Sequence, residues 1–134
     1  MELNEYQRLA QRTSSDTCLR YEKMNNGILG MAGEAGECVD LLKKHLYQGH
    51  VLDPEKLLEE VGDVLWYVAE TAAGLGKTLE EVAQHNIDKL KKRYPEGFDP
   101  QRSIHRPEYE AENKKEENHG STPALLFDMR NETV

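Results

Sequence analysis

Four carboxylate residues have the spacing of a metal site. Glu34 and Glu37 stand three residues apart, and Glu60 and Asp63 repeat that spacing further along the chain. Side chains at positions i and i+3 project from the same face of a helix. Two antiparallel helices that face each other would therefore gather all four carboxylates in one place.

The spacing by itself is common. Acid pairs three residues apart also occur at Glu2/Glu5, Glu37/Asp40 and Glu96/Asp99. For an isolated pair, a solvated helix face is the ordinary interpretation. The context of this set differs, because no Lys or Arg occurs between Lys23 and Lys43 and because Asp63 directly precedes the most apolar run of the chain. Carboxylates close together in such surroundings repel one another, and a bound cation stabilises their ionised form.

The predicted ligands are oxygens alone, which restricts the choice of ion. Di-iron helical bundles use a Glu-x-x-His motif, whereas the third-position partners here are Glu37 and Asp63. An all-oxygen set favours Mg²⁺, with Mn²⁺ as the alternative. Because Mg²⁺ held by a few carboxylates keeps positions open for substrate phosphates, the pattern indicates phosphate chemistry.

Basic residues that could bind phosphate oxygens follow the carboxylates in the sequence. Asn86, Lys89 and Arg93 occupy positions i, i+3 and i+7 of a predicted helix and form one polar stripe. Lys and Arg side chains there could bind polyphosphate oxygens. The alternative is a solvated basic helix end, since cations near a helix C-terminus also suit the dipole.

Composition excludes several classes of partner. The chain of 134 residues carries 17 Lys and Arg against 25 Asp and Glu, a formal charge of −8. This balance argues against binding a nucleic-acid polymer or an anionic membrane surface. The longest apolar run, Val64–Ala69, is too short to span a membrane, and no secretory signal is visible at the start. Cys18 and Cys38 are too few for a disulfide framework, so we expect a cytoplasmic protein.

The elements that would position these residues are all helical. Apolar residues recur at helical spacing over residues 3–12 and 23–47. A third helix should begin at the Asp53-Pro54 start signal and run to about residue 73. A capping box at Thr78–Glu81 begins a fourth helix, which ends at Tyr94–Gly97. The short connection after the second helix makes it an antiparallel neighbour of the third.

The second helix contains Gly27, Gly30, Gly33 and Gly36. Each glycine costs about 1 kcal/mol relative to Ala in a helix interior, so we expect close approach of another helix along this stretch. We therefore predict an all-α fold, an antiparallel bundle of about four helices whose core is completed by oligomerisation. Residues 1–100 form the predicted domain, and residues 101–134, which are highly polar, form a C-terminal tail that we expect to be mobile.

Three segments in order resemble the MazG-like family of all-α nucleoside triphosphate pyrophosphohydrolases. The first two contain the family pattern Glu-x-x-Glu followed by Glu-x-x-Asp, with 22 residues between Glu37 and Glu60. The third contains the basic stripe and its Tyr-Pro-Glu-Gly-Phe end. The matching segments cover residues 29–37, 59–67 and 86–98.

This resemblance implies Mg²⁺-dependent hydrolysis of a (d)NTP between the α and β phosphates, in nucleotide-pool housecleaning. By resemblance, Glu34, Glu37, Glu60 and Asp63 would hold the metal and carry catalysis. Asn86, Lys89 and Arg93 would bind the substrate phosphates. The family also implies a homodimer or a homotetramer. The alternatives are a narrow dUTP, dCTP or phosphoribosyl-ATP hydrolase of the same superfamily, or a non-catalytic helical oligomerisation module.

Base selectivity lies outside this pattern. Five side chains could line a base pocket or could serve only in packing, and packing is the more common role for such residues. They are Tyr6, Gln7, His45, Trp66 and Tyr67.

Overall fold

A computed structural model describes residues 1–15 and 19–105, and these residues contain helices and no strand. The elements are α1 (Leu3–Ala10), the 3₁₀ turn η1 (Gln11–Thr13), α2 (Arg20–Gln48), α3 (Pro54–Gly74), α4 (Leu79–Arg93) and α5 (Pro100–Ile104). The predicted all-α class is confirmed. The chain divides into two compact units, residues 1–89 and a second unit that begins at Leu90.

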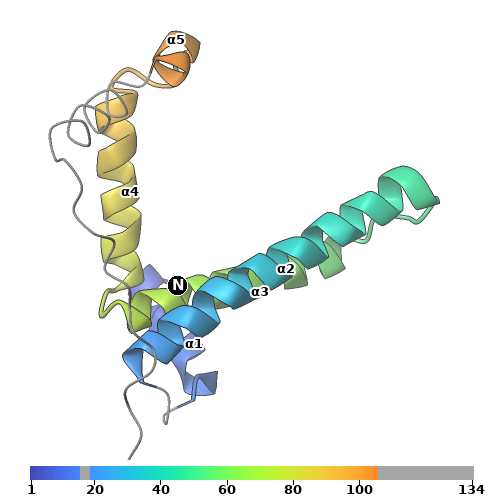
Figure 1. The fold of residues 1–134 in the computed structure, drawn as a ribbon, viewed down its shortest axis with the longest axis horizontal. Helices are drawn as coiled ribbons and strands as arrows, with labels where there is room; N and C mark the ends of the chain where they lie inside the picture. The colour runs from blue at the N-terminus through green and yellow to red at the C-terminus, as the bar shows by residue number, and fades with distance from the viewer. Residues whose placement is uncertain (16–18, 106–134) are drawn as a thin grey trace, which may run out of the picture. The chain divides into compact units, whose positions relative to one another are not determined.

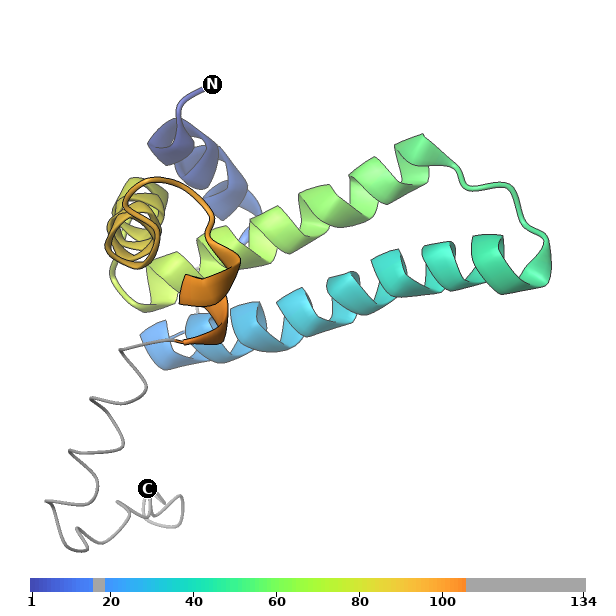
Figure 2. The same cartoon turned by 90° about the horizontal axis from the view of Figure 1, so that it is seen from above.

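An antiparallel pair of long helices dominates the first unit. The 29 residues of α2 and the 21 residues of α3 lie side by side, as Figures 1 and 2 show. The turn between them begins at Gly49, which is the C-cap of α2. Its φ of 75° lies in the left-handed region, which glycine adopts readily. The prediction that these helices are antiparallel neighbours is confirmed.

Two of the four glycines of α2 allow this close approach. A Cβ atom on Gly27 would lie 2.2 Å from Thr71 Oγ1 and 2.9 Å from the Tyr67 carbonyl oxygen, and one on Gly30 would meet the Tyr67 ring. A Cβ on Gly33 or Gly36 would meet no atom within 4 Å. The expectation of a close helix is therefore confirmed for Gly27 and Gly30, whereas for Gly33 and Gly36 it stays a prediction, because no other described helix of the same chain lies against them.

The predicted helix starts have the expected capping contacts. The Asp53 side chain accepts hydrogen bonds from the backbone N–H groups of Glu55 (3.1 Å) and Lys56 (3.5 Å) at the start of α3. At the start of α4, the Glu81 N–H donates to Thr78 Oγ1 (3.1 Å), and the Thr78 N–H donates to Glu81 Oε2 (2.8 Å). This reciprocal pair is a capping box.

Some boundaries differ from prediction. The first helix ends at Ala10 and continues as the turn η1, while α2 begins at Arg20, three residues before the predicted start. The short helix α5 was not predicted, although Asp99 caps it by accepting hydrogen bonds from the N–H groups of Gln101 (2.8 Å) and Arg102 (3.4 Å). Residues 106–134, most of the predicted tail, lie outside the described residues.

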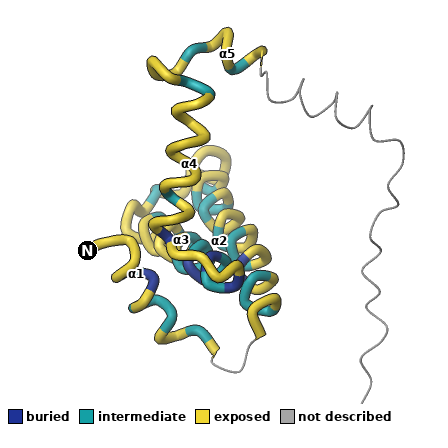
Figure 3. Tube along the Cα trace, turned by 90° about the vertical axis from the view of Figure 1, so that its left-hand side faces the viewer, coloured by how far each residue is buried: buried dark blue, intermediate teal, exposed yellow. Residues whose placement is uncertain are grey.

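The core of the described part is small. Its buried apolar residues are Ala69, Ala72 and Leu79, with Tyr6, Ala10 and Val68 packed against them. Large apolar side chains of α2 and α3 are exposed, among them Leu29, Val39 and Leu58. Figure 3 colours the trace by burial and shows few buried positions. No described helix is long and apolar enough to cross a membrane.

Candidate metal centre

Helices α2 and α3 bring three of the four predicted carboxylates together. Glu34 from α2 and Glu60 and Asp63 from α3 each offer a carboxylate oxygen, and these oxygens all lie within 4.8 Å of one another. Glu34 and Glu60 are half-buried, while Asp63 is exposed. We call these three residues the acidic cluster. Glu37 is exposed and does not belong to the set of three oxygens.

Desolvation and the neighbouring carboxylates of the acidic cluster raise the pKa of Glu60. The pKa of Glu60 is raised above its ordinary value, first by desolvation and then by the charges of Glu34, Glu37 and Asp63. A hydrogen bond with the Glu34 side chain raises it further. Glu37 thus lies close enough to act on Glu60.

Asp40, one turn after Glu37 on α2, has a lowered pKa, in contrast to the raised pKa of Glu60. Asp40 forms ion pairs with Lys43 and Lys44, and hydrogen bonds from these two ammonium groups lower the pKa of Asp40 to about 2. None of the ion pairs that Lys43, Lys44, Lys77 and Arg102 form includes a carboxylate of the acidic cluster. The spacing of Glu37 and Asp40 therefore belongs to a solvated helix face, whereas the acidic cluster retains uncompensated charge.

The backbone beside the acidic cluster is open. A Cβ on Gly33, Gly36 or Gly62 would meet no atom within 4 Å. Gly33 directly precedes Glu34, Gly36 directly precedes Glu37, and Gly62 directly precedes Asp63 in the sequence. A side chain at these three positions would therefore meet no steric obstacle within the described part of one chain.

The acidic cluster fits a hard divalent cation. Its donors are oxygens alone, they converge within a few ångströms, and mutual repulsion raises the pKa of Glu60. Mg²⁺ and Mn²⁺ prefer such oxygen ligands, and a bound cation would relieve the repulsion. Glu34, Glu60 and Asp63 could hold such an ion directly.

The predicted phosphate-binding residues lie on α4. Asn86 and Lys89 are exposed in the first unit, while Arg93 is half-buried in the second. In the described part of the chain, no hydrogen bond or ion pair joins Asn86 or Lys89 to the acidic cluster. Their role in binding substrate therefore stays a prediction, as does that of Arg93.

The candidate base-pocket residues have different roles. Trp66 Nε1 donates to the Ala10 carbonyl oxygen (3.1 Å) and to Thr13 Oγ1 (2.9 Å), so Trp66 anchors the turn after α1. Tyr67 packs at Gly30, and the exposed His45 places Nδ1 2.9 Å from the His50 carbonyl oxygen. These are packing and turn contacts, and a part in a base pocket stays a prediction for the three residues.

Tyr6 is the member of that group with a link to the acidic cluster. Burial raises the pKa of the Tyr6 hydroxyl, and the negative charge of Asp63 raises it further. Tyr6 also packs against the small core of Ala69, Ala72 and Leu79. Tyr6 therefore lies within electrostatic reach of Asp63.

Glu70 is a buried polar residue that the sequence patterns did not single out. Its side chain is 2% exposed and accepts hydrogen bonds from Gln11 Nε2 (2.8 Å) and Ser14 Oγ (2.9 Å). Lys23 Nζ in turn donates to Ser14 Oγ (2.7 Å). The sequence signal for a buried role is that Glu70 is the one charged residue within residues 64–74, the apolar end of α3.

Comparisons with known proteins match the helices that carry the acidic cluster. The family model of the MazG nucleotide pyrophosphohydrolase domain matches residues 23–98. Gene 37 protein of Mycobacterium phage L5 is 38% identical over 84 residues, which cover 60% of this chain and 74% of the phage protein. No solved structure matches the chain significantly.

Proposed function

Because the chain belongs to the MazG nucleotide pyrophosphohydrolase family, we propose that it hydrolyses a (d)NTP between the α and β phosphates in the presence of Mg²⁺. The products are the nucleoside monophosphate and pyrophosphate. The observation that carries this proposal is the convergence of oxygens from Glu34, Glu60 and Asp63 within 4.8 Å of one another. Mn²⁺ is the alternative ion.

The carboxylates have two tasks in this reaction. Glu34, Glu60 and Asp63 hold the ion, and the nearby Glu37 completes the set of acids. Bound Mg²⁺ supplies positive charge that offsets the charge of the triphosphate. A carboxylate of the set accepts a proton from the water that attacks the α phosphorus. The bond between that phosphorus and the bridging oxygen breaks, and pyrophosphate leaves with the bonding electrons.

The polar stripe of α4 binds the phosphates. Lys89 and Arg93 stabilise the charge that develops on the leaving pyrophosphate, and Asn86 donates hydrogen bonds from its amide. The exposure of Asn86 and Lys89 supports this role, because both side chains are accessible to a ligand.

A second copy of the chain covers the apolar surface of the helical pair. Exposed apolar side chains such as Leu29 (74%), Val39 (65%) and Leu58 (63%) support this part of the proposal, because the described part of one chain buries very few apolar residues. The expected assembly is a homodimer or a dimer of dimers in the cytoplasm.

A substrate panel tests the reaction. The purified chain is incubated with Mg²⁺ and with each (d)NTP or phosphoribosyl-ATP, and the products are separated by anion exchange. We expect monophosphate and pyrophosphate, whereas diphosphate and orthophosphate would refute cleavage between the α and β phosphates. Narrow dUTP, dCTP or phosphoribosyl-ATP hydrolysis would appear as turnover of that compound alone.

Matched variants test the site. Glu34→Gln should abolish turnover, while Asp40→Asn should leave it nearly unchanged, because Asp40 is already paired with Lys43 and Lys44. Equal effects of the two variants would contradict the assignment of the metal centre. An absence of turnover with every nucleotide, together with a stable oligomer, would favour the non-catalytic module.

A further inference from the structure

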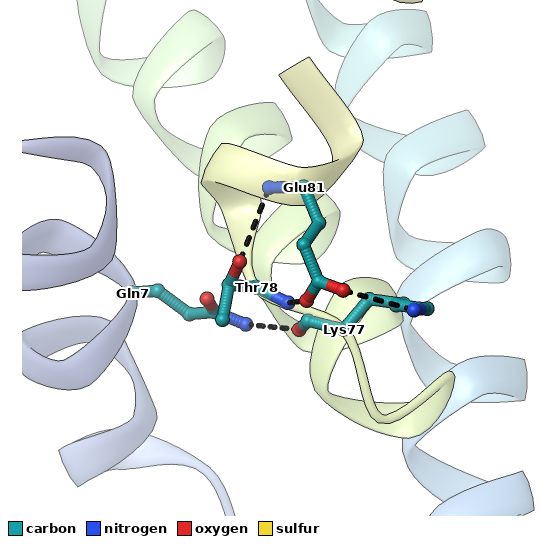
Figure 4. A network of polar contacts seen from close by, with 4 residues as sticks. All are labelled: Gln7, Lys77, Thr78 and Glu81. Carbon is teal, nitrogen blue, oxygen red and sulfur yellow. Dashed lines mark hydrogen bonds and ion pairs between the residues drawn. The ribbon is translucent and has the colours of Figure 1, made fainter. Parts of the chain in front are cut away.

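Side chains of α1 cap the start of α4. The first N–H groups of a helix have no acceptor within that helix. Gln7 Oε1 accepts a hydrogen bond from the Leu79 N–H (2.8 Å), and Gln7 Nε2 donates to the Lys77 carbonyl oxygen (3.0 Å). Gln7 is 9% exposed and Leu79 is 4% exposed. Figure 4 shows Gln7 reaching from α1 to the turn that precedes α4.

Asn4 makes a second pair of contacts one turn earlier on α1. Asn4 Oδ1 accepts a hydrogen bond from the Glu80 N–H (3.2 Å), and Asn4 Nδ2 donates to Glu80 Oε2 (2.6 Å). The next N–H group, that of Glu81, is capped by Thr78 within the turn itself. Two of these three successive N–H groups at the start of α4 are therefore capped by side chains of α1.

The remainder of α4 in the first unit is largely exposed. Residues 84–89 are all exposed, including Asn86 and Lys89. Lys89 lies ten residues after Leu79, a distance of about 15 Å along the helix axis, so a tilt of about 10° at the first turn would move it by about 2.6 Å. A displacement of about 1 Å can cost about 100-fold in rate when it misplaces a reacting group.

The same α1 helix is fixed to α3, which carries Glu60 and Asp63. Trp66 of α3 donates to the carbonyl oxygen of Ala10 at the end of α1. Buried Glu70 of α3 accepts hydrogen bonds from Gln11 and Ser14 in the segment that follows. Helix α1 therefore contacts the carboxylate-bearing helix and the start of α4 at the same time.

We propose that Asn4 and Gln7 are positioning residues, which set the direction of α4 and thereby place Asn86 and Lys89 relative to the acidic cluster. This inference rests on the proposed function, in which those two residues bind substrate phosphates. Neither Asn4 nor Gln7 contacts the substrate in this account. Their effect on phosphate binding is transmitted through the first turn of α4.

A reciprocal exchange of side chains tests this role. In the parent, Asn4 Nδ2 lies 2.6 Å from Glu80 Oε2 and donates a hydrogen bond to it. Asn4→Asp replaces this donor with a second carboxylate oxygen, so the two acidic side chains repel each other. Adding Glu80→Gln reverses the original hydrogen bond, because the new amide can donate to the new carboxylate. The acceptor for the residue-80 N–H is kept, and the double variant also restores the net charge. Asn25→Asp, at an exposed position of α2, is the control for added charge.

The assay is isothermal titration calorimetry of the full chain with inorganic tripolyphosphate in Mg²⁺. Tripolyphosphate lacks a base and a ribose, so it reports the phosphate site alone. We expect Asn4→Asp to weaken its binding by about tenfold, and the double variant and Asn25→Asp to bind within about twofold of the parent. KM for the nucleotide should follow the same order. The Mg²⁺-induced rise in Tm should stay unchanged in all variants, since the acidic cluster is intact.

Four results would overturn the inference. Asn4→Asp could bind tripolyphosphate as tightly as the parent, or Glu80→Gln could fail to restore the binding that Asn4→Asp loses. A variant could lose the Mg²⁺-induced rise in Tm together with tripolyphosphate binding, or the parent itself could fail to bind tripolyphosphate. Failure of the proposed reaction is distinguishable. If the parent hydrolyses no nucleotide but tripolyphosphate binding follows the expected order, the reaction is wrong and the positioning role stands.

Discussion

Gly27→Ala and Gly33→Ala make the same chemical change on the same helix and should have opposite effects on stability. A Cβ on Gly27 would lie 2.8 Å from the Thr71 backbone nitrogen and 2.9 Å from the Tyr67 carbonyl oxygen. These are backbone atoms of α3, so they can yield only if the two helices separate. A Cβ on Gly33 would meet no atom within 4 Å.

The two contributions can be estimated separately. Replacing Gly by Ala within a helix stabilises the protein by about 1 kcal/mol through helix propensity. Overpacking a close contact costs about 1–3 kcal/mol, and the upper end applies at Gly27 because backbone atoms are involved. We therefore expect Gly27→Ala to lower the free energy of unfolding by about 2 kcal/mol and Gly33→Ala to raise it by about 1 kcal/mol. The expected difference between the variants is about 3 kcal/mol.

Urea unfolding followed by far-UV circular dichroism measures this difference. All proteins are compared at one chain concentration, since oligomerisation shifts apparent stability by mass action. A stabilising effect of Gly27→Ala, or equal shifts of the two variants, would refute the packing argument for α2 and α3. If Gly33→Ala instead destabilises the protein and weakens self-association, a second copy of the chain packs at Gly33.

The remaining predictions concern charge. Asp63→Asn should abolish the rise in Tm that Mg²⁺ gives to the parent, a stabilisation of about 2.7 kcal/mol when the Mg²⁺ concentration is 100 times Kd. If differential scanning calorimetry shows the parent's rise in this variant, Asp63 is not a ligand. Glu60→Gln should raise the Tm of the metal-free protein at neutral pH, because it removes one charge from a cluster whose repulsion raises the pKa of Glu60; a lower Tm in EDTA would contradict this. Hydrogen bonds from Lys77 and from the Thr78 N–H hold the pKa of Glu81 at about 2, so its ionised form stabilises the fold above its ordinary pKa. The stability advantage of the parent over Glu81→Gln should therefore shrink as pH falls from about 4.5 to about 2, and a constant difference in urea midpoint over that range would disprove it.

The sequence by itself determined the features that depend on neighbouring residues. Asp53-Pro54 and Thr78/Glu81 mark helix starts because their capping contacts reach only two or three residues along the chain. The spacing of the two carboxylate pairs likewise follows from helix geometry. The start of α5 at Asp99-Pro100 has the same local capping signal as the start of α3 at Asp53-Pro54.

The tertiary structure alone decided which side chains meet across helices. Spacing treats Gly27 and Gly33 alike, yet only Gly27 contacts α3, because the register between two helices depends on their mutual packing. Gln7 caps a helix that begins 72 residues later, and no local pattern specifies such a contact. The same register selects Glu34, Glu60 and Asp63 for the acidic cluster and leaves Glu37 outside the set of three oxygens. Sequence periodicity specifies the face of a single helix, whereas a site formed by two helices depends on how those faces are aligned.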